Sequence, residues 1–79
     1  MALYFLHQRG GDREFVDEEG QELASLDAAR CSAIRGIRSI LADEIMRGRL
    51  DLGERIDICD GGGTVLMNVP FAHALELAR

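Results

Sequence analysis

The longest regular pattern of apolar positions lies in the middle of the chain and predicts a helix over residues 26–47. From residue 26 onward, apolar side chains recur at helical spacing within about 160° of arc, a stripe wide enough to pack against a core. The stripe consists of Leu26, Ala29, Ala33, Ile34, Ile37, Ile40, Leu41 and Ile45. Ser25 precedes it as an N-cap and Gly48 follows it as a stop signal, so the pattern has both a start and an end.

Two short segments before the helix have the composition of strands. Residues 2–8 are aliphatic and aromatic, and residues 13–20 are more polar. They flank the turn signal RGGD, which predicts a hairpin, with residues 21–25 as a connector to the helix.

Two further strand patterns follow the helix. Residues 55–60 alternate in polarity, and residues 64–71 are strongly strand-like as far as Pro70, after which a short helical turn is expected. The order β-β-α-β-β predicts an α+β fold and a single domain over residues 1–79. We expect a four-stranded, largely antiparallel sheet with one long helix packed on one face.

The first and the last predicted strands along the chain carry apolar side chains on both of their faces. In the first, Leu3 and Phe5 point one way, and Tyr4 and Leu6 point the other. In the last, Leu66 opposes its apolar neighbours Val65, Met67 and Val69. One helix covers only one face of a sheet, whereas two-sided apolar strands are typical of sheets buried on both sides. We therefore expect the uncovered face to bind a partner, most simply a second copy of the chain.

Two charges within the helical stripe suggest a second way to self-associate. Arg30 and Glu44 are 14 residues apart, about 21 Å along a helix, so they cannot pair within it. Ile37 lies midway, and an antiparallel helix pair centred there would place Arg30 of one copy against Glu44 of the other. The alternative is that Arg30 reaches the acidic hairpin while Glu44 lies near the helix end. The predicted interface residues are Arg30, Ala33, Ile37, Glu44, Tyr4, Leu6 and Leu66.

The three consecutive glycines at residues 61–63 invite comparison with a phosphate-binding loop. Such a loop leads into a helix N-terminus, whose free N–H groups bind the anion. Here the glycines lead into a strand pattern, and the lysine of a nucleotide-binding loop is absent. The pattern predicts a hairpin turn that needs positive φ.

Charge and the length of the apolar runs limit the kinds of partner that we expect for this chain. The chain has 79 residues and a net charge of −5, with acids concentrated in residues 12–27 and arginines in residues 28–49. The overall negative charge disfavours nucleic-acid binding without excluding it. No apolar run has the length of a membrane span, and we recognise no export signal, so we expect a cytoplasmic protein with no membrane partner.

The residues that could carry chemistry form no recognisable constellation. Cys31 and Cys59 lack the spacing of a disulfide framework or zinc site, and His7 and His73 have no nucleophile at motif spacing. The acids around Glu18 do not match a calcium-binding loop. We therefore expect no cofactor, no metal and no enzymatic activity.

Several motifs in this order resemble a family of small bacterial proteins, common in alphaproteobacteria, that is known only as a domain of unknown function. The motifs are LYFLHQRGGD, DEEGQEL, AAR, GRLDL and VLMNVPFAHALEL, and they span nearly the whole chain. The chain departs from the family's pattern at His73, where an acid is commoner. The resemblance implies the β-β-α-β-β order and no particular activity.

Two hypotheses about function follow. The first is a small non-enzymatic interaction module that forms a homodimer and binds an unidentified protein partner. The second, by analogy of fold alone, is an accessory or regulatory protein associated with nucleic acid.

Overall fold

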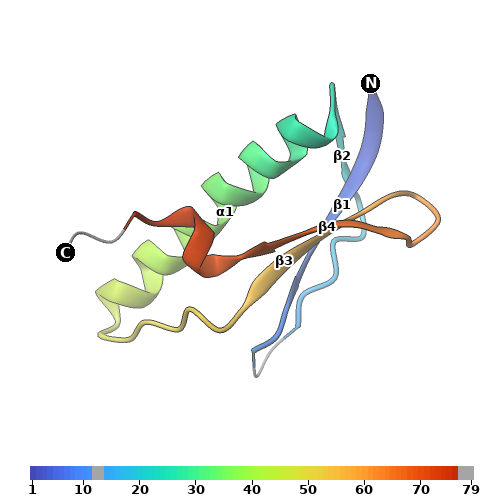
Figure 1. Ribbon diagram of the computed structural model, residues 1–79. Helices are drawn as coiled ribbons and strands as arrows, with labels where there is room; N and C mark the ends of the chain where they lie inside the picture. Colours follow the sequence, from blue (N-terminus) through green and yellow to red (C-terminus); the bar gives the residue numbers. More distant parts are fainter. Residues whose placement is uncertain (12–13, 77–79) are drawn as a thin grey trace.

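A computed structural model describes residues 1–11 and 14–76 of the chain as an α+β fold (Figure 1). The elements follow in the order β1 (Ala2–Arg9), β2 (Gln21–Leu23), α1 (Leu26–Met46), β3 (Arg55–Cys59), β4 (Val65–Pro70) and the short 3-10 helix η1 (Phe71–Ala74). All neighbouring strands are antiparallel, and the sheet has the order β2-β1-β3-β4. The predicted fold class and element order are confirmed.

The helix α1 begins and ends where its capping residues predict. The Ser25 hydroxyl accepts a hydrogen bond from the Ala28 amide at 3.1 Å. At the other end, Gly48 has a φ of 80° and donates its amide to the Ile45 carbonyl at 2.9 Å. The buried residues Ala29, Ala33, Ile37 and Leu41 form the face that packs on the sheet.

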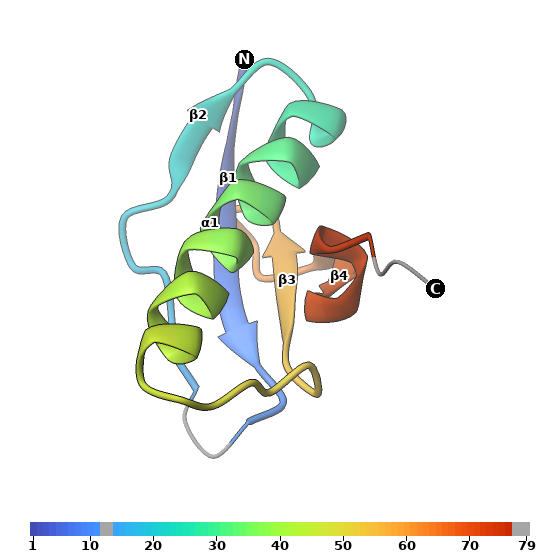
Figure 2. The same cartoon turned by 90° about the vertical axis from the view of Figure 1, so that its left-hand side faces the viewer.

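The register of the sheet decides which side chains meet the helix. Leu6 pairs with Ile58, and Ile58 pairs with Met67, so alternate residues of the three strands share the face under α1 (Figure 2). The core beneath the helix consists of Tyr4, Ile56, Ile58, Val69, Phe71 and Ala74, with Leu6 and Met67 packed against it. Phe71 and Ala74 belong to η1, which lies on the same side of the sheet as α1.

The second strand is shorter than predicted and begins later in the sequence. Sequence patterns placed it at residues 13–20, but β2 consists of Gln21–Leu23, the segment expected to be a connector. Within residues 14–20, which we call the arm, only Phe15 pairs with β1, through an isolated bridge to Gln8. Residue 13 lies outside the described part of the chain.

Asp17 is the physical reason for this difference. Its carboxylate accepts the Leu6 amide at 3.1 Å, the place on the edge of β1 where a strand would otherwise pair. It also accepts the amides of Glu19 and Gly20, which turns the chain. Gly20 has a φ of 75°, which glycine adopts without steric cost.

A β-bulge changes the predicted faces of the last strand. Met67 pairs with Ile58, yet Val65 pairs with Cys59, so Leu66 is an extra residue between the two pairs. Val65 was predicted to share a face with Met67. The bulge instead places Val65 opposite Cys59, on the other side of the sheet.

The resulting molecule is a thin slab. Its principal extents are 37 × 26 × 16 Å, and α1 and η1 both lie on one side of the sheet (Figure 2). The opposite face of the sheet carries no helix in the described part of the chain. No helix within those residues combines the length and apolar character needed to cross a membrane.

The N-cap allows a direct test of helix stability. Ser25→Ala removes the acceptor of the Ala28 amide, and we expect the free energy of unfolding to fall by about 1 kcal/mol in urea denaturation. The control is Ser39→Ala, an exposed position in the middle of α1, where alanine is the better helix former and no loss is expected. Equal losses in the two variants would contradict the capping role.

Candidate interaction surface

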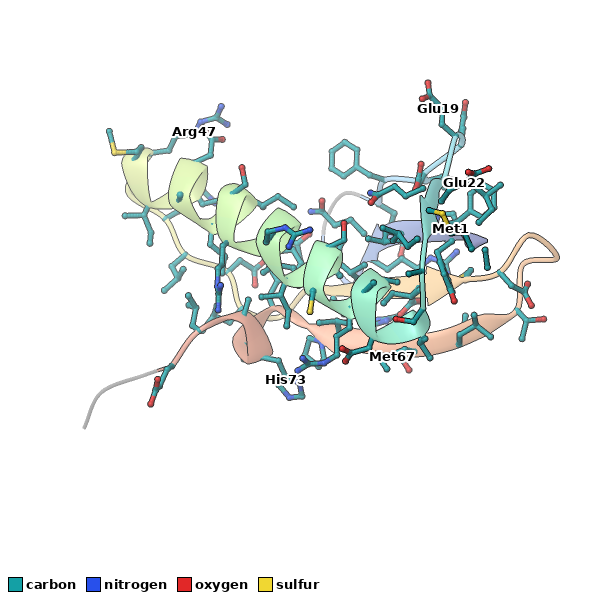
Figure 3. All side chains as sticks on the ribbon, turned by 90° about the horizontal axis from the view of Figure 1, so that it is seen from above. Met1, Glu19, Glu22, Arg47, Met67 and His73 are labelled. Atoms are coloured by element: carbon teal, nitrogen blue, oxygen red, sulfur yellow. The ribbon has the colours of Figure 1, made fainter. Side chains whose placement is uncertain are left out.

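The candidate interaction surface is the sheet face that points away from α1. We call it the open face. Alternation along β1 places Leu3, Phe5, His7 and Arg9 on it, and their register partners follow. These partners are Glu22 on β2, and Cys59, Asp57 and Arg55 on β3, with Val65 and Asn68 next to them on β4. The open face thus spans the whole sheet, from Glu22 on β2, labelled in Figure 3, to Val65 and Asn68 on β4. Met67 of β4, also labelled there, belongs to the opposite face and packs under α1.

A buried carboxylate organises one half of the open face. Asp57 is 2% exposed although no helix covers it. Its oxygens accept hydrogen bonds from Arg9 Nη1 at 3.2 Å, Arg55 Nε at 2.9 Å and the Asn68 amide. Burial tends to raise the pKa of this carboxyl, but the bonds from Asn68 and Arg55 and the charges of both arginines outweigh it and hold the pKa below its usual value.

His7 connects this cluster to the arm. Its Nδ1 accepts the Asp17 amide at 3.0 Å, so the neutral ring carries its proton on Nε2. The imidazole also stacks on Phe5, with ring centroids 6.4 Å apart. Burial tends to raise the pKa of Asp17, but the amides of Gly20, Leu6 and Glu19 and the nearby His7 lower it overall. The carboxylate of Asp17 therefore stays charged and keeps the arm against β1.

The other half of the open face is apolar. Leu3 is 43% exposed and Val65 44%. Leu3 and Phe5 pack beside Gly20, where a β-carbon would approach the leucine side chain to 3.0 Å. Val65 lies opposite Cys59, and Cys59 lies opposite Phe5. The apolar side chains of β1, β3 and β4 are therefore neighbours in one patch across three strands.

The structure corrects most of the predicted interface. Ala33 is 1% exposed and Ile37 is fully buried, both against the chain's own sheet, so a helix pair centred on Ile37 has no surface to form it. Tyr4 and Leu6 were predicted on the uncovered face, but both pack under α1. Both faces of β1 are apolar, so the sequence pattern alone did not identify the face that the helix covers.

The remaining predicted interface residues lie apart from one another. Glu44 is half-buried and accepts the Asp51 amide at 3.3 Å within its own chain. Arg30 is half-buried near the start of α1, and no ion pair of this residue is found within residues 1–11 and 14–76. Leu66 is 42% exposed, but as the extra residue of the bulge it has no register partner that assigns it to a face, so its place on the uncovered face stays a prediction.

The triglycine segment forms a hairpin turn, as predicted. It joins β3 to β4, and the Asp60 carboxylate accepts the amides of Gly62 and Thr64 at 2.9 and 3.0 Å. Gly63 has a φ of 87° and donates its amide to the Asp60 carbonyl. The amides that a phosphate loop would offer to a ligand are thus bound to Asp60.

The remaining candidates for chemistry lie far apart or buried. Cys31 is exposed on α1, and His73 is exposed on η1. Cys59 is buried in the sheet, and this burial raises the pKa of its thiol. Within the part of the chain that the structure describes, no three His, Cys, Asp or Glu side chains are grouped so that they could hold a metal ion.

One hollow lies beside the end of α1 and not on the open face. It has a volume of about 470 Å³ and is lined mainly by charged side chains. Two of them, Asp43 and Arg47, form an exposed ion pair at 3.2 Å, and Glu44 holds the loop at Asp51. Asp51 and Glu54 also line the hollow, and their carboxylates accept hydrogen bonds from the Gly53 amide and from Gln8 Nε2. Each carboxylate of the lining thus has a partner within the chain.

The sequence analysis missed the cluster around Asp57. An acid between Ile56 and Ile58 is typical of a strand with one solvated face, and that was how the pattern was interpreted. Arg55 was a partial signal of the cluster, because residues two apart on a strand lie on the same face. Arg9 and Asn68 come from other strands, and only the register brings them to Asp57.

The pKa of Asp57 predicts how stability depends on pH. A carboxyl whose pKa is lower in the folded chain stabilises the fold above its unfolded pKa of about 4, and this contribution is lost as pH falls through the folded value. At pH 7, Asp57→Asn should lower the free energy of unfolding by about 2 kcal/mol, since it removes the charge that both arginines bind. The difference from wild type should shrink towards pH 3, as measured by urea denaturation.

The matched control is Asp43→Asn, which breaks an ion pair between two exposed side chains. Such pairs contribute about 0.5 kcal/mol or less. A loss at Asp57 that is no larger than at Asp43, or that persists unchanged at pH 3, would contradict the assigned role of Asp57.

Comparison with known proteins agrees with the expected family. No match was found among the curated proteins or among the solved structures. One family model, described as a domain of unknown function, matches residues 3–72, which include β1 from Leu3 onward, the other three strands, α1 and the beginning of η1. The chain therefore belongs to the DUF6894 family.

Proposed function

We propose that this chain is a small, non-enzymatic interaction module that self-associates by packing its open face against a second copy. The observation that carries the proposal is the patch formed by Leu3 and Val65, each more than 40% exposed on a sheet face that no helix of the described residues covers. Leu66, which is 42% exposed, lies next to Val65 in the chain. Exposed apolar patches of this kind are typical of protein interfaces. A second copy on this face would bury the patch and produce a four-layer sandwich of helix, sheet, sheet and helix.

The size of the chain also favours a partner. A domain of 8.7 kDa has a limited core of its own and gains stability when a second subunit buries more of its apolar surface.

The state of the polar groups on the open face favours binding over catalysis. Both oxygens of Asp57 accept hydrogen bonds from arginine side chains, and Nδ1 of His7 accepts the Asp17 amide. An acid or base that is already bound and has no nucleophile beside it is poorly suited to proton transfer. We expect the module to act in the cytoplasm, where Cys31 and Cys59 remain thiols.

A substitution in the patch tests the proposal. Val65→Asp places a charge in the apolar half of the open face, and we expect it to convert a dimer into a monomer in sedimentation equilibrium. The control is Ile45→Asp, because Ile45 is 58% exposed on α1, away from the open face. Wild-type protein that stays at 8.7 kDa at high micromolar concentration would rule out self-association.

A second candidate function is supported by one specific observation. The Phe5–His7 stack lies on the open face beside Arg9 and Arg55, a combination found on sheets that bind single-stranded nucleic acid. The net charge of −5 opposes this function.

Binding to nucleic acid can be measured independently of self-association. If the second candidate holds, a labelled single-stranded oligonucleotide should show increased fluorescence anisotropy with this protein at low salt and should be released as salt increases. Unchanged anisotropy at low salt with both DNA and RNA would eliminate it.

A further inference from the structure

The open face has opposite charges at its two ends. At one end, Glu22 on β2 pairs with Leu3 on β1 and shares its face. At the other end, Arg9 on β1 pairs with Arg55 on β3. Leu3 and Arg9 are six residues apart along one strand, which separates the two ends by about 20 Å. Between them lie the Phe5–His7 stack and the buried Asp57.

Two identical sheets can pack face to face with a two-fold axis in two ways. In one, the strands of both copies run in the same direction and like ends meet, so the arginines of one copy face the arginines of the other. In the second, the strands run in opposite directions and each end meets the opposite end of its partner. Like charges in contact across an interface are unfavourable, and unlike charges select an orientation.

We propose that the second copy packs on the open face in the opposite direction, so that Glu22 of each copy binds Arg9 of the other. This inference rests on the proposed function and adds the orientation of the partner. It follows from charge complementarity, since this orientation pairs the acidic end with the arginine end twice. The midpoint of β1 then lies near the two-fold axis, and the Phe5–His7 stack of each copy meets that of its partner.

The arginines are well placed to bind a second carboxylate. Arg9 contacts Asp57 through Nη1 and Arg55 contacts it through Nε, so other N–H groups of both guanidinium groups remain available. Their side chains are 34% and 43% exposed. Two arginines and one aspartate leave a net positive charge at this end. The contacts with Asp57 also fix the arginine side chains before the partner arrives, which reduces the entropy lost on binding.

Charge reversal at the acidic end tests the orientation and avoids the Asp57 cluster. Glu22 is exposed, so Glu22→Arg is not expected to disturb the fold. We expect this variant to raise the dimer dissociation constant about tenfold, since each dimer loses two attractive contacts and gains two repulsive ones. The control is Glu76→Arg, an exposed position after η1 with the same change in net charge, for which we expect less than about a threefold effect.

The same measurement separates the two possible orientations. If like ends meet, Glu22 lies at the same end of the interface as Glu22 of the partner and far from the partner's arginines, and the reversal would leave the dissociation constant unchanged or lower it. Either result would overturn the proposed orientation while the proposed function stands. Dissociation by Val65→Asp reports on the open face as an interface whatever the orientation, so failures of the two proposals are distinguishable.

A distance measurement provides an independent second readout. Spin labels at Ala24→Cys, an exposed position two residues after Glu22, in a chain that also carries Cys31→Ser, should lie more than about 20 Å apart across the dimer if the ends are exchanged. Labels about 15 Å apart or closer would indicate that like ends meet. Cys59 is buried and should not react with the label.

Discussion

A sheet has two faces, and the described part of this chain has one long helix, of 21 residues, with which to cover it. The helix α1 and the short η1 both pack on the same side, so the chain's own core accounts for only half of the sheet's surface. The composition of the open face follows from this constraint. The open face is in contact with water in the free monomer and, on our proposal, packs against a second copy in the dimer.

The two halves of the open face meet this requirement in different ways. In the half that contains Asp57, arginines from β1 and β3 cover the carboxylate and donate hydrogen bonds to it. This half of the open face is therefore well packed although no apolar layer covers it. Where Leu3 and Val65 lie, apolar side chains remain exposed. The arm follows the edge of β1 because Asp17 accepts backbone amides there, which leaves β2 only three residues long.

The sequence was most informative about features that depend on neighbouring residues. The helix boundaries follow from Ser25, Gly48 and the apolar stripe, and the hairpin at residues 61–63 follows from its flanking strand patterns. Predictions that depended on distant contacts were less successful. The face of β1 under the helix depends on the packing of α1, and the position of β2 depends on hydrogen bonds between Asp17 and the edge of β1.

The candidate site was predictable only in outline. The imbalance between one helix and strands that are apolar on both faces correctly indicated an uncovered sheet face. Its residues could not be assigned, because Tyr4 and Leu3 are equally plausible core residues in a pattern of period two. The charged pair Arg30 and Glu44 directed attention to the helix, whereas the charges that mark the open face come from three strands joined only by their register.

The central claim is that the open face becomes buried when the protein associates. The most direct measurement is the relaxation of side-chain methyl groups by a soluble paramagnetic agent, recorded by NMR over a series of protein concentrations. We predict that the methyl groups of Leu3 and Val65 become protected as concentration rises, while those of Ile45 and Leu50, which are exposed elsewhere, do not change. Equal exposure of the open-face methyl groups at all concentrations would contradict the account.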